Sequence, residues 1–96
     1  MIIDDDNEDL KAVRLGIEAE IFMASPLGKH LATRAQEEID DATNHLIKAN
    51  PSDIEANTRL RNRIYVAAES IKWIQQTALE GRTAHERIKE QEAQDY

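Results

Sequence analysis

The chain has no cysteine and few aromatic residues. Its 96 residues include one Trp, two Tyr and one Phe, while 32% of them are charged. The lack of cysteine excludes a disulfide framework, a thiolate metal site and a thiol nucleophile. With so few large side chains, a monomer would have a thin core. We therefore expect stability to come from oligomerisation or from docking on a partner.

Long apolar runs and a secretory signal are also missing. No stretch approaches the roughly 20 apolar residues that span a bilayer. Met1-Ile2-Ile3 leads directly into Asp4-Asp5-Asp6, without the basic and apolar regions of a signal peptide. We expect a soluble protein that does not contact membranes, either cytoplasmic or made in the cytoplasm and carried in a particle.

Positive charge is scarce, with 12 Lys and Arg against 19 Asp and Glu, a formal net charge of −7. The excess is N-terminal: residues 1–24 hold seven acids and two bases (−5), whereas residues 51–96 hold eight acids and seven bases (−1). Direct nucleic-acid binding requires a basic face that displaces phosphate counterions. We therefore expect no direct nucleic-acid partner.

Only two prolines interrupt a chain with helical periodicity, so we predict an all-α fold. Residues 1–6 should be a disordered acidic arm, followed by one domain over 7–96 with helices at about 7–24, 26–49 and 52–94. Ser52 and Glu55 have the spacing of a capping box at the start of the third helix. Its inward stripe, with steps of three and four, is Leu60, Ile64, Ala67, Ile71, Ile74, Ala78, Gly81, His85 and Ile88.

The connection around Pro51 is too short for anything except an antiparallel hairpin of the second and third helices. Placing Ile39 opposite Ile64 puts small and apolar residues against each other along the whole seam. The predicted hairpin core is Leu27, Leu31, Ile39, Leu46, Leu60, Ile64, Ile71 and Ile74. The shorter N-terminal helix should pack on the long one with a face of Leu10, Val13, Ile17, Ile21 and Ala24, with Phe22 beside it.

The long helix has more apolar surface than this hairpin covers. Val66 and Trp73 stand on one flank of its inward stripe, and Tyr65 and Leu79 lean to the other. A helix that is apolar over so wide an arc has more than one neighbour. We predict Tyr65, Val66, Trp73 and Leu79 as the interaction surface, with a second copy of the chain or another protein as the partner.

Candidate catalytic and metal-binding groups are incomplete. Glu37-Glu38-Ile39-Asp40-Asp41 resembles one half of the Mg²⁺ site of all-α nucleotide pyrophosphohydrolases, but the facing stretch of helix three offers one acid, Glu69. His45 follows Asp40 and Asp41 at helical spacing, a pattern that also fits a solvated face. His85-Glu86 lacks the second histidine of a zinc-protease motif. We predict no enzyme activity, no cofactor, no metal site and no small-molecule substrate.

Arg59, Arg61 and Arg63 form a short basic run near the start of the third helix. Arg59 lies four residues after Glu55, a spacing that allows an ion pair on a solvated helix surface. The run could instead dock an acidic partner, and the acidic N-terminal arm of a neighbouring copy is one candidate.

Several short motifs resemble those of small helical proteins that tailed bacteriophages encode near their packaging and head genes. The motifs are Phe22-x-x-Ser25-Pro26-Leu27-Gly28-Lys29-His30-Leu31, Arg34-Ala35-Gln36-Glu37-Glu38, Asn50-Pro51-x-Asp53, Ala67-Ala68-Glu69, Trp73-Ile74 and Glu80-Gly81. The resemblance covers most of residues 20–82 and implies a phage protein located in the host cytoplasm or the virion. It attaches no mechanism to any residue.

Together these features predict a non-enzymatic phage interaction protein, one that self-associates or acts as a small virion-assembly factor. The alternative is an acidic inhibitor whose N-terminal carboxylates occupy the nucleic-acid groove of a host nucleic-acid-binding or defence protein.

Overall fold

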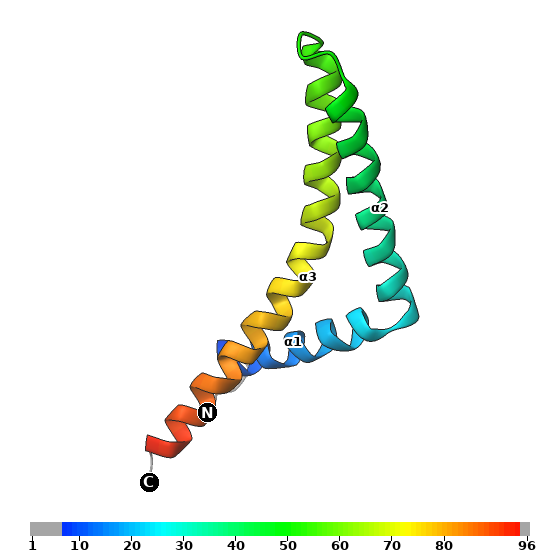
Figure 1. Cartoon of the computed structure of the whole chain (residues 1–96). Helices are drawn as coiled ribbons and strands as arrows, with labels where there is room; N and C mark the ends of the chain where they lie inside the picture. The colour runs from blue at the N-terminus through cyan, green and yellow to red at the C-terminus, as the bar shows by residue number, and fades with distance from the viewer. Residues whose placement is uncertain (1–6, 95–96) are drawn as a thin grey trace. The chain divides into compact units, whose positions relative to one another are not determined.

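The computed structural model describes residues 7–94 and contains three helices, α1 (Glu8–Ala24), α2 (Pro26–Lys48) and α3 (Ile54–Gln94) (Figure 1). The predicted all-α fold is confirmed, because α2 and α3 form an antiparallel hairpin and the shorter α1 also packs on α3. The acidic arm predicted over residues 1–6 lies outside the described residues. None of the helices within residues 7–94 is long and apolar enough to cross a membrane.

The contacts gather in two compact units that share α3. We call residues 26–73 the hairpin unit; it holds α2 and the first part of α3. Of the described residues, 7–25 and 74–94 form the crossing unit, in which α1 meets the second part of α3. The single domain predicted over residues 7–96 remains a prediction.

Short polar side chains set the ends of α1. Asn7 caps its start, because Asn7 Oδ1 accepts hydrogen bonds from the backbone N–H groups of Asp9 (3.0 Å) and Leu10 (3.2 Å). At the other end, Ser25 Oγ donates to the Phe22 carbonyl oxygen at 2.6 Å, and the Ser25 N–H donates to the same oxygen. Pro26 then opens α2 at a position where a missing N–H costs nothing.

The cap of α3 differs from the predicted one. Asp53 Oδ1 accepts from the Ala56 N–H at 3.1 Å, so Asp53 is the N-cap instead of Ser52. Ser52 is held elsewhere, because its N–H and its hydroxyl both donate to Asn50 Oδ1, at 3.0 and 2.8 Å. The side-chain amide of Asn57 donates to the Asn50 carbonyl oxygen and closes the turn. An asparagine-centred turn therefore replaces the capping box and starts α3 two residues later.

Small side chains form most of the core of the hairpin unit. Ala42, Leu60 and Ala67 are buried, and the larger predicted core residues of this unit, Ile39, Leu46, Ile64 and Ile71, are half-buried. Leu27 and Leu31 differ from the prediction, because both are exposed at the beginning of α2. The seam is therefore closed near Ala42 and Leu60, whereas at the start of α2 the buried residue is Gly28 and the leucines beside it are exposed. Ile74, the eighth predicted core residue, belongs to the crossing unit and is half-buried.

Two glycines lie at the centre of the crossing unit. A Cβ atom built on Gly16 of α1 would lie 2.7 Å from Gly81 Cα and 3.2 Å from the Thr77 carbonyl oxygen. A Cβ atom on Gly81 would likewise lie 2.7 Å from Gly16 Cα and 2.9 Å from the Ala12 carbonyl oxygen. The two backbones are therefore in direct contact, which only residues without a side chain allow. Ala19, Ala78 and Ala84 extend this buried contact.

Two ion pairs join the same helices. Arg87 Nη2 donates to Asp9 Oδ1 at 2.7 Å, and Arg82 Nε donates to Glu20 Oε1 at 2.7 Å. The hydrogen bond from Arg87 holds the pKa of Asp9 below its usual range. These pairs specify how α1 is oriented on α3, because each links one end of α1 to a different turn of α3.

The packing face of α1 agrees with the prediction only in part: Leu10, Val13 and Phe22 are half-buried, but the centre of the face differs. Ile17 and Ile21, which were expected to face α3, are exposed, while Gly16 and Ala19 are buried. The close backbone contact explains the difference, since a Gly–Gly crossing leaves no room for branched side chains at its centre. On α3, the predicted inward stripe continues through Gly81 to Ile88, except that His85 is exposed.

Candidate interaction surfaces

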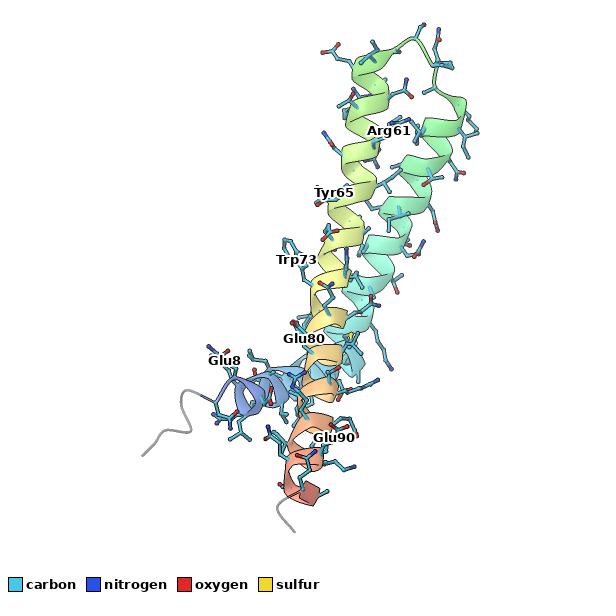
Figure 2. All side chains as sticks on the ribbon, turned by 90° about the vertical axis from the view of Figure 1, so that its left-hand side faces the viewer. Glu8, Arg61, Tyr65, Trp73, Glu80 and Glu90 are labelled. Carbon is cyan, nitrogen blue, oxygen red and sulfur yellow. The ribbon has the colours of Figure 1, made fainter. Side chains whose placement is uncertain are left out.

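The outward side of α3 in the hairpin unit is rich in large exposed side chains. Tyr65, Val66 and Trp73 are 65%, 64% and 65% exposed. Figure 2 shows Tyr65 and Trp73 on the side of α3 that faces away from α2. Val66 lies on the same side of the helix as Trp73, because the two residues are seven positions, or about two turns, apart. Leu79, the fourth predicted surface residue, is also exposed and lies on the part of α3 in the crossing unit.

A charged pair lies within this apolar surface. The Glu69 side chain is only 18% exposed, and Lys72 Nζ lies 3.5 Å from Glu69 Oε1. Glu69 follows Tyr65 by four residues and precedes Trp73 by four, so it lies between them on one face of the helix. We call this set of Tyr65, Val66, Glu69, Lys72 and Trp73 the α3 face.

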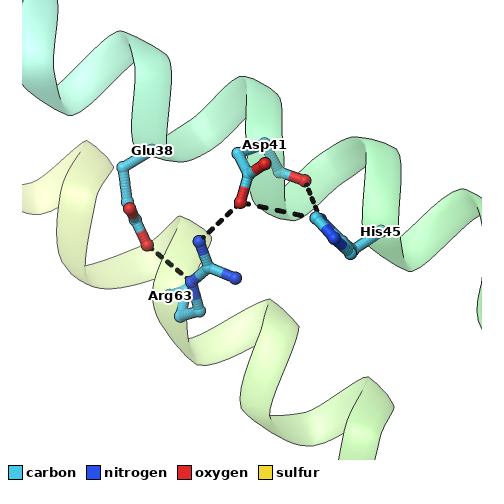
Figure 3. A network of polar contacts seen from close by, with 4 residues as sticks. All are labelled: Glu38, Asp41, His45 and Arg63. Atoms are coloured by element: carbon cyan, nitrogen blue, oxygen red, sulfur yellow. Dashed lines mark hydrogen bonds and ion pairs between the residues drawn. The ribbon is translucent and has the colours of Figure 1, made fainter.

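On the hairpin's inner side, Arg63 joins the two helices (Figure 3). Its Nε donates to Glu38 Oε1 at 2.5 Å, and its Nη2 donates to Asp41 Oδ2 at 2.9 Å. These hydrogen bonds lower the pKa of both carboxyls and raise the pKa of the guanidinium. The network places Arg63 beside residues 38–41 of α2. This position agrees with the predicted register, which places Ile64, the next residue in the chain, opposite Ile39.

The same network changes the interpretation of the acidic run over residues 37–41. Glu38 and Asp41 could have formed half of a metal site, but here a guanidinium occupies the space between them. Arginine is always protonated in this setting, so its single positive charge offsets one of the two carboxylate charges. Within residues 7–94, no three His, Asp or Glu side chains converge as metal ligands.

His45 extends the network along α2. Its Nδ1 donates to the Asp41 carbonyl oxygen at 2.8 Å and lies 3.6 Å from Asp41 Oδ2 (Figure 3). A carbonyl oxygen only accepts, so this contact is a hydrogen bond in the form of the ring that carries a proton on Nδ1. The ring is exposed and ties the last turn of α2 to the preceding one.

An open depression of about 400 Å³ lies at the tip of the hairpin, where α2 ends and α3 begins. Ile47 and Ile54 are each 76% exposed there, more than any other large apolar side chain of residues 7–94. Arg61 brings one positive charge to the same depression. The complete lining is Leu46, Ile47, Ala49, Pro51, Ile54, Asn57, Thr58 and Arg61. We call this depression the tip site.

Sequence reasoning missed the two contacts that join helices most specifically. The Arg63 network could have been found, because the predicted pairing of Ile39 with Ile64 also brings Glu38 near Arg63. The Gly16–Gly81 contact has a weaker signal, a glycine among alanines on each helix. Small residues at helical spacing do not reveal which helices they join.

Comparisons with protein-family models, with curated protein sequences and with solved structures found no match. The function therefore has to be argued from the surfaces described above.

Proposed function

We propose that the chain is a non-enzymatic bacteriophage protein that works through helix–helix contacts, by self-association or as a small virion-assembly factor. The supporting observation is the α3 face, where three large apolar side chains are each about two-thirds exposed. Most of the buried residues, by contrast, are glycine or alanine. The fold thus buries mainly small residues and leaves several large apolar side chains exposed to solvent.

Apolar surface of this kind favours association. Clustered exposed apolar side chains on a monomer often mark a binding site. Tryptophan and tyrosine are enriched among the residues that dominate interface energy, with losses of about 2 kcal/mol or more on truncation. Tyr65 and Trp73 lie on the same face of one helix, so a single partner helix can contact both.

The charges of the α3 face favour a second copy as that partner. In a two-fold symmetric contact, the same patch meets itself, so each charge must find its opposite within the patch. Glu69 and Lys72 meet this condition, because the lysine of each copy can pair with the glutamate of the other. A strongly one-signed patch would repel itself, and this one is balanced.

The resemblance to small helical phage proteins supports a role in the virion or in its assembly. Protein shells and rings are built by repeated use of one subunit, and a self-complementary helix face would supply the dimeric unit of such an assembly. The acidic-inhibitor alternative rests on the N-terminal carboxylates; of that run the structure describes Glu8 and Asp9, and Asp9 is paired with Arg87.

Light scattering tests the proposal. At about 100 µM, wild type should have a mass above that of the 10.9 kDa monomer, and the double variant Trp73→Ala/Val66→Ser should shift toward monomer. Circular dichroism should show unchanged helicity, because both side chains are exposed. The matched control is Leu15→Ser/Ile21→Ala, which removes two exposed apolar side chains from α1 and should leave the mass unchanged.

Tryptophan fluorescence gives an independent readout. If Trp73 lies in an interface, dilution of wild type should shift its emission to the red as the interface dissociates. A wild type that remains monomeric at high concentration, with emission independent of dilution, would refute self-association. An equal loss of mass in the α1 control would refute the assignment to the α3 face.

A further inference from the structure

The tip site is suited to an extended segment of defined chemistry. Two isoleucines, each 76% exposed, and Leu46 supply aliphatic surface, and Arg61 supplies a positive charge beside them. Within residues 7–94, Arg61 forms no hydrogen bond or ion pair through its side chain, whereas Arg63, Arg82 and Arg87 each form an ion pair with a carboxylate. The complementary ligand is a short peptide with aliphatic side chains next to carboxylates.

Two other polar side chains at the tip are already engaged. The amide of Asn57 donates to the carbonyl oxygens of Asn50 and Asp53, and the Asp53 carboxylate caps α3. This leaves Arg61 as the lining side chain whose charge is available to a ligand. Salt bridges of exposed arginines are weak alone, so the aliphatic contacts must supply most of the affinity.

We propose that the tip site binds the N-terminal residues 1–6 of a second copy of the chain. This segment, Met1-Ile2-Ile3-Asp4-Asp5-Asp6, has three aliphatic side chains followed by three carboxylates. It therefore matches both the apolar lining and the charge of Arg61. The inference rests on the proposed self-association, because it takes the ligand from another copy.

The geometry of assembly follows from this pairing. A contact between an N-terminal segment and a hairpin tip uses two different surfaces, so it is heterologous and produces rings or open chains. The α3 face, in contrast, pairs two copies symmetrically and stops at a dimer. Both contacts together would build assemblies larger than dimers from a single kind of subunit.

A peptide-binding experiment tests the site. The probe is a fluorescently labelled peptide of residues 1–6, and the receiver is the full chain carrying Asp4→Asn, Asp5→Asn and Asp6→Asn, whose own segment has lost the charges that pair with Arg61 and should compete less with the probe. Anisotropy should show saturable binding, and Arg61→Glu in the receiver should weaken it about tenfold, since the change reverses the pairing charge.

Three controls make the result specific. A peptide of the same composition in scrambled order should bind more weakly, because the aliphatic and acidic parts are no longer separate. Ile47→Ser/Ile54→Ser should weaken binding through lost apolar contact. Arg59→Glu makes the same charge change two residues away, outside the lining, and should have a much smaller effect. Equal binding of the ordered and scrambled peptides, or none, would overturn the proposal.

A mixing experiment tests whether the segment comes from a second copy. The Arg61→Glu chain keeps its N-terminal segment but loses the site, whereas a chain with Asp4→Lys, Asp5→Lys and Asp6→Lys keeps the site but loses the segment. Each alone should have a smaller mass than wild type, and their mixture should exceed both. Masses that equal wild type for each variant would overturn the second-copy assignment, even if the peptide binds.

The two proposals fail in distinguishable ways. A monomeric wild type at high concentration would refute self-association whatever the peptide does. Associated wild type whose mass is insensitive to Arg61→Glu, but falls with Trp73→Ala/Val66→Ser, would refute the tip site alone.

Discussion

Gly81→Ala is the most informative single substitution in the crossing unit. The added Cβ atom would lie 2.7 Å from Gly16 Cα and 2.9 Å from the Ala12 carbonyl oxygen. Carbon atoms in favourable contact are about 3.5–4.0 Å apart, so the two helices must separate by nearly 1 Å. Both neighbouring atoms belong to backbone, so no side-chain rotation can relieve the clash.

The expected size of the effect combines two opposing contributions. Alanine is favoured over glycine within a helix by about 1 kcal/mol. Overpacking of a close contact costs roughly 1–3 kcal/mol. Gly81→Ala should therefore lower the free energy of unfolding by up to about 2 kcal/mol, although it improves the intrinsic helix propensity of α3.

Thr83→Ala is the matched control, because Thr83 is an exposed position on the same helix. It should stabilise by roughly 0.5 kcal/mol through helix propensity alone. Thermal unfolding followed by circular dichroism measures both variants, and 1 kcal/mol corresponds to a shift of about 4–8 °C for a chain of this size. Hydrogen exchange should also show faster exchange of the α1 amides in Gly81→Ala.

A double variant sharpens the test. Gly16→Ala and Gly81→Ala insert atoms into the same contact, so once one has separated the helices the other should cost less than it does alone. The double variant should therefore be less destabilised than the sum of the two. If Gly81→Ala is as stabilising as Thr83→Ala and leaves the hydrogen exchange of the α1 amides unchanged, the close backbone contact between α1 and α3 at Gly16 and Gly81 is refuted.

Two further predictions concern the hairpin unit. Ile39→Asp should lower the free energy of unfolding by more than about 2 kcal/mol, because it puts an unpaired charge in the seam. The control, Ile47→Asp, changes an exposed position and should cost under about 0.5 kcal/mol. Equal melting temperatures for the two variants would contradict the predicted register of the hairpin. Arg63→Gln should lower the melting temperature at pH 7. Because Arg63 lowers the folded-state pKa of Glu38 and Asp41, its stabilisation is complete above their ordinary values near 4 and disappears as the pH falls through the lowered ones. The two melting curves should therefore converge in acid, and a constant difference down to pH 2 would contradict the network.

Helix positions, which depend on local residue patterns, were read correctly from the sequence, although the capping box at Ser52 was not. The two prolines and the helical periodicity predicted helix ends within two residues of those in the structure. The stripe from Leu60 to Ile88 faces inward almost throughout, apart from His85. Such features depend on neighbours one turn away, so they are visible in a single sequence. The exposure of Tyr65, Val66 and Trp73 also agrees with the arc left over by that stripe, while their role in binding remains a prediction.

The sequence alone thus determined three helices, their boundaries and the antiparallel pairing of α2 with α3. Only the tertiary structure decided which side of α1 is buried. Apolar spacing favoured Ile17 and Ile21, yet the buried residues are Gly16 and Ala19. The physical reason is distance: two helices can approach until their backbones touch only where both lack side chains. Whether two glycines far apart in sequence meet at such a point is a property of the folded chain.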